Sequence, residues 1–321
     1  MKPIDIHQFF DQHSRILGEG AVIERLRRGG CELDPHVVNS AFIYDDVNRS
    51  AIETIYRQYL DIGLEYDLPL VLSTPTWRAS RERIEAAGYG SRDLNGDNFR
   101  FLDALRATYK SYAQKVAICG LLSCRGNAYN PSEALGAEEA HRFHAWQAER
   151  LAAAGADFLL AATLPALSEA IGLATALAGT GTPYVVSFVV RPEGTLLDGT
   201  PLKQALAAIE DSVSPRPLAF MANCTHPSFL RSALVHNEHS SLHVRQRIIG
   251  LFANTAALTP EELDNRKSLV EEDPDTFSRT IAGLHADFDL KLLGGCCGTD
   301  ERHIRSLAIR LQAPDRPLFQ P

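Results

Sequence analysis

Short apolar runs rich in β-branched residues recur along the 321-residue chain at intervals of a few dozen residues. Runs that are short and almost continuously apolar are typical of strands that are buried on both faces of a parallel sheet. Segments with helical periodicity separate most of them, which favours repeated strand–helix units. The chain has eight such runs, at residues 15–21, 68–76, 115–122, 157–164, 183–190, 218–224, 247–255 and 289–297.

Helix signals lie between these runs. Residues 138–155 are periodically apolar and end on Gly155, a residue suited to a helix C-terminus. Thr259, Pro260 and Glu262 follow the order of a helix start, with an N-cap, a proline in the first turn and a capping box. We also expect Thr299 to cap the last helix.

Eight strand–helix units predict a single-domain (β/α)8 TIM barrel over residues 1–321. The alternative is an open, doubly wound α/β sheet, which the number of strands does not exclude. No glycine-rich dinucleotide-binding fingerprint supports that alternative. Residues 39–65 are expected to add helix and loop to the barrel. Residues 170–190 carry no charge, but two glycines and a proline interrupt them, so we predict a helix, a turn and a strand rather than a membrane span.

Composition places the chain among ordinary globular proteins, with 45% hydrophobic and 22% charged residues. The net charge of −8 is spread without a basic stripe, which argues against a nucleic-acid partner. The first residues lack the apolar stretch of a secretory signal. We therefore expect a cytoplasmic protein with reduced thiols and small-molecule partners, and we leave open whether it forms a homo-oligomer.

Three of the six cysteines fall at the ends of predicted strands. Cys224 closes the sixth run, and Cys296 and Cys297 close the eighth. Catalytic groups of a barrel lie where strands end, so we expect these thiols to converge there. Three thiolates are suitable ligands for zinc and leave a fourth position open for a substrate. Of the others, Cys31 and Cys119 are expected in the core, and Cys124 in the core or at the rim.

The charge of such a site indicates its chemistry. A zinc ion with three thiolates carries a net charge of about −1, which makes it a poor Lewis acid for generating hydroxide. A substrate thiol that binds there is ionised at neutral pH and stays nucleophilic. The residues therefore favour alkyl transfer to sulfur over hydrolysis.

The two cysteine motifs together resemble the homocysteine S-methyltransferase family. They read "MANCTHP" around Cys224 and "LLGGCCGT" around Cys296 and Cys297, and "AGADFLL", "LPALSEA", "PYVVSF" and "DGTPL" extend the resemblance over nearly the whole chain. The resemblance implies a (β/α)8 barrel whose three cysteines bind zinc. It also implies methyl transfer from a sulfonium or betaine donor to homocysteine, giving methionine, with S-methylmethionine or S-adenosylmethionine as the leading donors. Asn223, Gly294 and Gly295 match the motifs and would hold the polar end of the substrate.

The sequence departs from the family at two positions that would help to bind the substrate's ammonium group. Gly18 stands where the family has an aspartate, and Ala162, followed by Thr163, stands where it has a glutamate. Glu19 either replaces one of these acids, shifted by a residue, or is a solvated charge at a strand end. The candidate substrate-binding residues are Glu19, Thr163, Asn223 and Gly295.

Three alternatives stay open at this point. The protein could methylate a different thiol acceptor, or it could be a non-catalytic barrel that binds zinc and thiols. A thiol redox protein is disfavoured, because adjacent cysteines form a disulfide only with strain.

Other polar residues at predicted strand ends are weaker candidates. Trp77 with Arg78, after Thr76, either flanks a cationic donor or packs the rim. Arg125 has the charge to meet a carboxylate. His226 is expected near the metal or at the surface, because the cysteines already supply three ligands.

Overall fold

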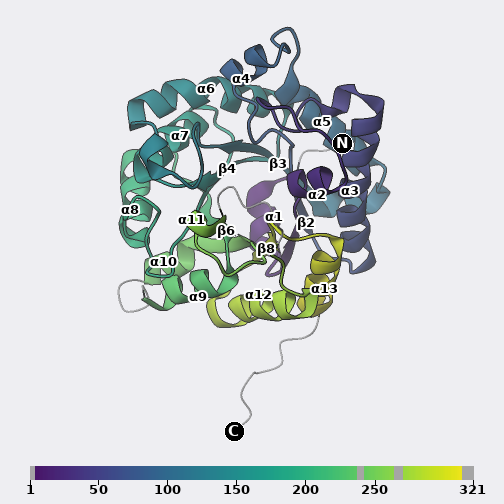
Figure 1. Ribbon diagram of the computed structural model, residues 1–321. Coiled ribbons are helices and arrows are strands. Elements are labelled where there is room, and N and C mark those ends of the chain that lie inside the picture. Colours follow the sequence, from purple (N-terminus) through teal and green to yellow (C-terminus); the bar gives the residue numbers. More distant parts are fainter. Residues whose placement is uncertain (1–3, 237–241, 264–269, 313–321) are drawn as a thin grey trace.

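Eight parallel strands form a closed barrel in chain order in the computed structural model, which describes residues 4–236, 242–263 and 270–312 (Figure 1). The last strand pairs with the first, so no edge is left open. Every predicted run overlaps a strand, which confirms the predicted barrel, and the doubly wound alternative is wrong. The strands are β1 Ile16–Gly18, β2 Leu70–Ser73, β3 Val116–Ser123, β4 Phe158–Leu164, β5 Tyr184–Phe188, β6 Ala219–Thr225, β7 Ile248–Ala253 and β8 Leu292–Gly295.

Helices surround the barrel and bury its outer face (Figure 1). The α-helices are α1 Ile6–Gln12, α2 Ile23–Arg28, α3 Asp46–Glu65, α4 Arg81–Ala86, α5 Leu94–Ala107, α6 Ala137–Ala154, α7 Leu167–Gly179, α8 Leu202–Ser212, α9 Pro227–His236, α10 Leu242–Arg247, α11 Pro260–Leu263, α12 Pro274–Phe288 and α13 Glu301–Gln312. The 3-10 helices are η1 Phe42–Tyr44, η2 Lys110–Lys115 and η3 Pro131–Glu133. The long α3 confirms that residues 39–65 add helix to the barrel.

A second hydrophobic core fills the inside of the barrel, and α1 covers one end of it. Phe9 and Phe10 of α1 are buried against apolar side chains from several strands. The ring of Phe10 packs edge-on against Phe158 at 5.8 Å between centroids. The sequence pattern did not predict α1, because its apolar positions fill less than two turns. The polar site therefore lies at the other end of the barrel.

Two of the three helix-end predictions are confirmed. Gly155 ends α6 in the left-handed region, with φ of 97°, where glycine is favoured. Thr259 and Glu262 form the predicted capping box, in which each side chain accepts a hydrogen bond from the other's backbone N–H. The prediction for Thr299 is wrong. Asp300 accepts from the backbone N–H of Arg302 at the start of α13.

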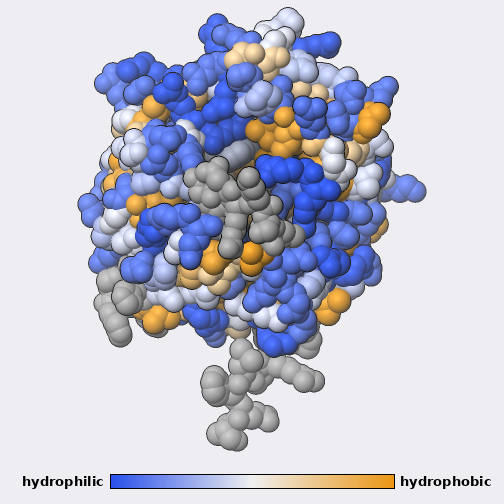
Figure 2. Space-filling view, viewed as in Figure 1, coloured by the Kyte–Doolittle hydropathy of each residue, from blue (hydrophilic) through white to orange (hydrophobic). Residues whose placement is uncertain are grey.

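Residues 170–190 form the end of α7, a turn and β5, as predicted. Within the described ranges, no helix combines the length and the apolar composition needed to cross a membrane. The face viewed in Figure 2 is mostly hydrophilic, with hydrophobic residues gathered near its centre.

Candidate metal and substrate site

Two irregularities in the strands shape the site. The register shifts between Ala161 and Leu164 on β4, and between Asn223 and Thr225 on β6. Inside them, Thr163 and Cys224 have left-handed backbones, with φ of 60° and 50°. Such conformations cost non-glycine residues about 1–3 kcal/mol and persist only where the surroundings hold them. Bulges of this kind re-aim side chains at barrel rims.

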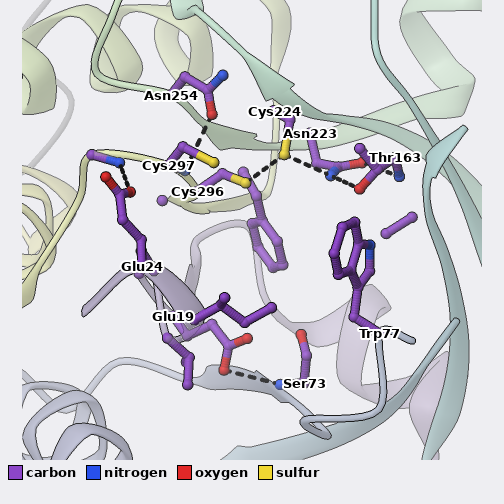
Figure 3. Close-up of a pocket in the computed structure, with 18 of the residues that line it drawn as sticks. Glu19, Glu24, Ser73, Trp77, Thr163, Asn223, Cys224, Asn254, Cys296 and Cys297 are labelled. Carbon is purple, nitrogen blue, oxygen red and sulfur yellow. Dashed lines mark hydrogen bonds between the residues drawn. The ribbon is translucent and has the colours of Figure 1, made fainter. Parts of the chain in front are cut away.

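The Asn223 side chain holds both bulges. Its Oδ1 accepts from the backbone N–H of Thr163 at 2.8 Å and from the Ser187 hydroxyl at 2.6 Å. Its Nδ2 donates to Thr163 Oγ1 at 2.7 Å and lies 3.5 Å from Cys224 Sγ. Asn223 therefore links β4, β5 and β6, and it fixes the direction of Cys224 (Figure 3).

The sulfur atoms of Cys224, Cys296 and Cys297 point toward one another, as Figure 3 shows. Their Sγ atoms all lie within 4.8 Å of one another, and within the described ranges no other group of three or more His, Cys, Asp or Glu residues could hold a metal ion. Sulfurs around a tetrahedral zinc lie about 3.8 Å apart, given Zn–S bonds of about 2.3 Å. Cys224 and Cys296 lie closer, at 2.6 Å, so this pair separates by about 1 Å to share such an ion. The donor set fits a soft, four-coordinate metal.

The adjacent cysteines are fixed by their backbones. Cys296 N–H donates to the carbonyl of Ala253 at 2.7 Å, and Cys297 N–H donates to Asn254 Oδ1 at 3.2 Å. The next N–H, of Gly298, donates to the Glu24 carboxylate at 2.5 Å. Sequence analysis missed Asn254 and Glu24. The available signal for Asn254 was its position at the end of the seventh run, directly after the last residue of β7.

Close packing explains why glycine precedes the two cysteines. A Cβ on Gly295 would lie 2.4 Å from Thr299 Oγ1. The Thr299 hydroxyl accepts from Ala21 N–H at 2.9 Å and donates to the Cys296 carbonyl at 2.7 Å. Thr299 therefore ties the end of β8 to the segment after β1, and this is why it does not cap α13.

The three thiols differ in their readiness to ionise. Hydrogen bonds from Cys224 and Cys296 stabilise the thiolate of Cys297 and hold its pKa well below the usual range of cysteine. The same contacts, taken with burial, raise the pKa of Cys296. The cluster therefore carries its negative charge first on Cys297, which is the exposed member.

The remaining cysteines lie outside the cluster, as predicted. Cys119 is fully buried, and burial raises the pKa of its thiol. Cys124 is also buried, with its pKa raised to about 11 by burial, and it belongs to the core. Cys31 is partly buried and packs against that core.

The cluster opens into a cavity of about 620 Å³ that Glu19 also lines. The Glu19 side chain is only 8% exposed, so the interpretation as a solvated strand-end charge is wrong. Its carboxylate accepts from the backbone N–H of Ser73 at 3.0 Å, and burial raises its pKa to about 8. Figure 3 shows Glu19 and Ser73 on the side of the cavity away from the sulfurs.

An apolar wall stands where the family's acids would lie. A Cβ on Gly18 would lie 2.3 Å from Cε1 of Phe252, so this ring fills the space of a side chain at position 18. Phe252, Ala162 and Leu160 all line the cavity. The structure therefore places no replacement acid at Gly18 or Ala162, and Glu19 approaches from the neighbouring backbone position.

The weaker candidates fall into different places. Trp77 faces the cavity, while Arg78 stacks on its ring at 4.3 Å and donates to backbone carbonyls (Figure 3). The Thr76 hydroxyl is buried and donates to a carbonyl. Arg125 meets a carboxylate of the chain itself, on α4, at 3.4 Å. His226 is buried, bonds to the Ser228 hydroxyl at 2.7 Å and does not join the cluster.

Fold and site together define a (β/α)8 barrel that carries a three-cysteine cluster, able to hold a metal ion, at the carboxyl ends of its strands. The family model described as "Homocysteine S-methyltransferase" matches residues 16–311, and the chain belongs to this family of methyltransferases.

Relatives and solved structures agree with the family. The chain is 26% identical to a homocysteine S-methyltransferase of Escherichia coli, over 95% of this chain and 98% of the relative. It is 23% identical to a selenocysteine Se-methyltransferase of Brassica oleracea, over 91% and 88%. The metallated form of the homocysteine methyltransferase MmuM from Escherichia coli superposes with a TM-score of 0.74 at 23% identity, covering 95% of this chain and 99% of that one.

Proposed function

We propose that the protein is a zinc-dependent thiol S-methyltransferase that moves a methyl group from S-methylmethionine or S-adenosylmethionine to homocysteine, giving methionine. The observation that carries the proposal is the convergence of three cysteine sulfurs in the lining of a cavity of substrate size. The family of the chain and the names of its relatives support the same chemistry.

Cys224, Cys296 and Cys297 would hold the zinc, which when bound lowers the pKa of an acceptor thiol so that it is ionised at neutral pH. The acceptor's proton leaves to solvent. Its sulfur electron pair then forms the new bond to the donor's methyl carbon. The bond between that carbon and the donor sulfur breaks. Its electron pair stays on the donor sulfur, so the sulfonium donor becomes a neutral thioether. The protein's part is to hold both sulfurs in line, because alignment supplies much of the rate.

Glu19 is the group that we assign to the acceptor's ammonium. It is the acid that lines the cavity on the side away from the sulfurs, and its carboxylate accepts a hydrogen bond from the backbone N–H of Ser73. An ammonium beside it would favour the ionised form and offset the cost of burial. Thr163, Asn223 and Gly295 contribute by shape in this proposal, because their polar atoms are already bonded within the protein.

A different thiol acceptor is the second candidate. The apolar wall of Phe252, Leu160 and Ala162 favours it, since it removes charge from the positions where the family would bind an amino acid. The selenocysteine Se-methyltransferase among the relatives indicates that acceptors differ between proteins similar to this one.

The test is methyl transfer by zinc-loaded protein, with homocysteine and each sulfonium donor in turn, followed by mass spectrometry of the product. We expect methionine from wild-type protein and none from Cys297→Ser. Methylation of other thiols but not of homocysteine would transfer the proposal to the second candidate. Thiol binding without product from any donor would leave a non-catalytic thiol-binding barrel and overturn the proposed function.

A further inference from the structure

The loop between β3 and α6, residues 124–136, is held in shape by hydrogen bonds between its own residues. The Glu133 carboxylate accepts from Asn127 N–H at 2.8 Å and from Asn130 Nδ2 at 2.9 Å. Asn127 Oδ1 in turn accepts from the backbone N–H of Tyr129 at 3.0 Å. We call this segment the Tyr129 loop. Its internal bonds give Tyr129 a defined position at the centre of the loop.

A buried carboxylate accepts hydrogen bonds from both ends of the Tyr129 loop. Glu169 on α7 is fully buried. Its Oε1 accepts from the backbone N–H of Arg125 at 2.7 Å, and its Oε2 accepts from that of Leu135 at 3.3 Å. The Nε2 atom of His144 lies 3.0 Å from Oε1. Glu169 therefore joins the two ends of the loop, and a third group on α6 holds Glu169 itself.

The loop brings Tyr129 to the cysteine cluster. Tyr129 lines the same cavity as Cys224, Cys296 and Cys297. A tyrosine phenol is protonated at neutral pH, so its hydroxyl can donate a hydrogen bond into this cavity. Beside it lies Asn254, whose buried side chain interacts with the Tyr129 phenol.

We propose that Tyr129 is a substrate-contacting residue whose hydroxyl donates a hydrogen bond to the sulfur of the acceptor thiol, and that Glu169 is the residue that positions it. The inference rests on the proposed function for the nature of the acceptor. A single donor at one side of the sulfur leaves its other lone pair free, and thereby directs that lone pair toward the incoming methyl carbon. Neither Tyr129 nor Glu169 was found by sequence analysis.

The first experiment compares Tyr129→Phe with Tyr109→Phe. Tyr109 is the matched control, because its hydroxyl bonds to Asp61 outside the cavity. Both variants and the wild type are loaded with cobalt and titrated with homocysteine and with 2-mercaptoethanol, following the sulfur-to-cobalt absorption band. We expect Tyr129→Phe to raise the dissociation constant of both thiols about 10- to 100-fold, as for loss of a hydrogen bond to a charged group, and Tyr109→Phe to leave it unchanged.

This titration separates failure of the inference from failure of the proposed function. Wild-type protein that binds thiols but yields no methylated product would contradict the proposed function and still test Tyr129 by binding. Tyr129→Phe that binds thiols within twofold of wild type would overturn the inference, whatever the turnover. Wild-type protein that binds neither thiol would overturn both.

The second experiment tests whether Glu169 acts through Tyr129. Glu169→Gln, Tyr129→Phe and the double variant are compared by thiol dissociation constant, with circular dichroism as the check on folding. We expect Glu169→Gln to weaken thiol binding. The double variant should bind no more weakly than Tyr129→Phe, because Glu169 acts only through the Tyr129 hydroxyl, which Tyr129→Phe has already removed. Effects that multiply would show that Glu169 does not position Tyr129. If Glu169→Gln fails to fold, His144→Gln makes the same comparison, because it removes a neighbour of Glu169 and leaves both loop N–H bonds.

Discussion

The cavity has two sides that are built in different ways. On the sulfur side, formed by Cys224, Cys296 and Cys297, the direction of each ligand is set by backbone hydrogen bonds, bulges and glycines. The Glu19 side, formed by Glu19, Ser73 and Phe252, consists of side chains on strand ends, with one acid among apolar groups. The family's motif is retained on the first side and lost on the second. The three converging sulfur atoms fix the chemistry of the site. Recognition of the substrate depends on many side chains, so one of them can change while the chemistry is kept.

The largest effect should come from removing a ligand on the sulfur side. Cys297→Ser is expected to lower the zinc content from about one ion per chain to almost none, and to abolish methyl transfer, because the ion needs all three sulfurs as ligands. Cys124→Ser is the control, since Cys124 is buried outside the cluster. Zinc is measured by atomic emission on freshly purified protein. Equal zinc content in both variants would contradict the assignment of the cluster.

Removal of the metal should destabilise the sulfur side without altering the Glu19 side. Zinc at a thousandfold excess over its dissociation constant stabilises a protein that binds it only when folded by about 4 kcal/mol. We therefore expect dialysis against a chelator to lower the melting temperature, and added zinc to restore it. In the zinc-free protein, the cluster cysteines should react with iodoacetamide in the order of their readiness to ionise, Cys297 first, while Cys119 stays protected. Zinc that protects none of them would contradict the site.

A smaller effect is expected from removing the side-chain hydrogen bonds that hold the sulfur side in place. Asn223→Ala removes the links among β4, β5 and β6, and should weaken zinc binding about 10- to 100-fold, as for other residues that orient metal ligands. Asn95→Ala is matched to it, because Asn95 on α5 is also buried and bonds to a backbone carbonyl, but belongs neither to the cluster nor to the cavity lining. Competition with a chromophoric chelator gives both affinities. Equal losses would mean that Asn223 supports only the fold.

The last effect concerns the Glu19 side and is a pH dependence. Burial raises the pKa of Glu19 from 4.5 to about 8, so the folded state binds an extra proton between these values. Stability from this group is therefore lost as the pH rises from 4.5 to 8, at up to about 1.4 kcal/mol per pH unit. Glu19→Gln should flatten this slope in urea titrations of the zinc-loaded protein at pH 6 and 8. An unchanged slope would show that Glu19 ionises freely in the folded state.

The sequence predicted what depends on local pattern. Continuous apolar runs identified all the strands, because burial on both faces leaves a signal within each run. The positions of Cys224, Cys296 and Cys297 at strand ends predicted their convergence, because parallel strands of a barrel end at the same rim. Gly155 and the pair Thr259 and Glu262 were readable for the same reason, since helix ends depend on neighbours a few residues away.

Only the tertiary structure decided which distant groups meet. Asn223 bonds to Thr163 across 60 positions of sequence, and Glu169 reaches Arg125 across 44, so no local pattern records either contact. The same reason explains why Tyr129 and Asn254 were missed, and why Thr299 was wrongly predicted as a helix cap. Whether Glu19 was a solvated charge or a buried group depended on the packing of Phe252 and its neighbours around the cavity. The sequence by itself determined the barrel and its three sulfurs, and folding determined the surroundings that set their charge and their access to substrate.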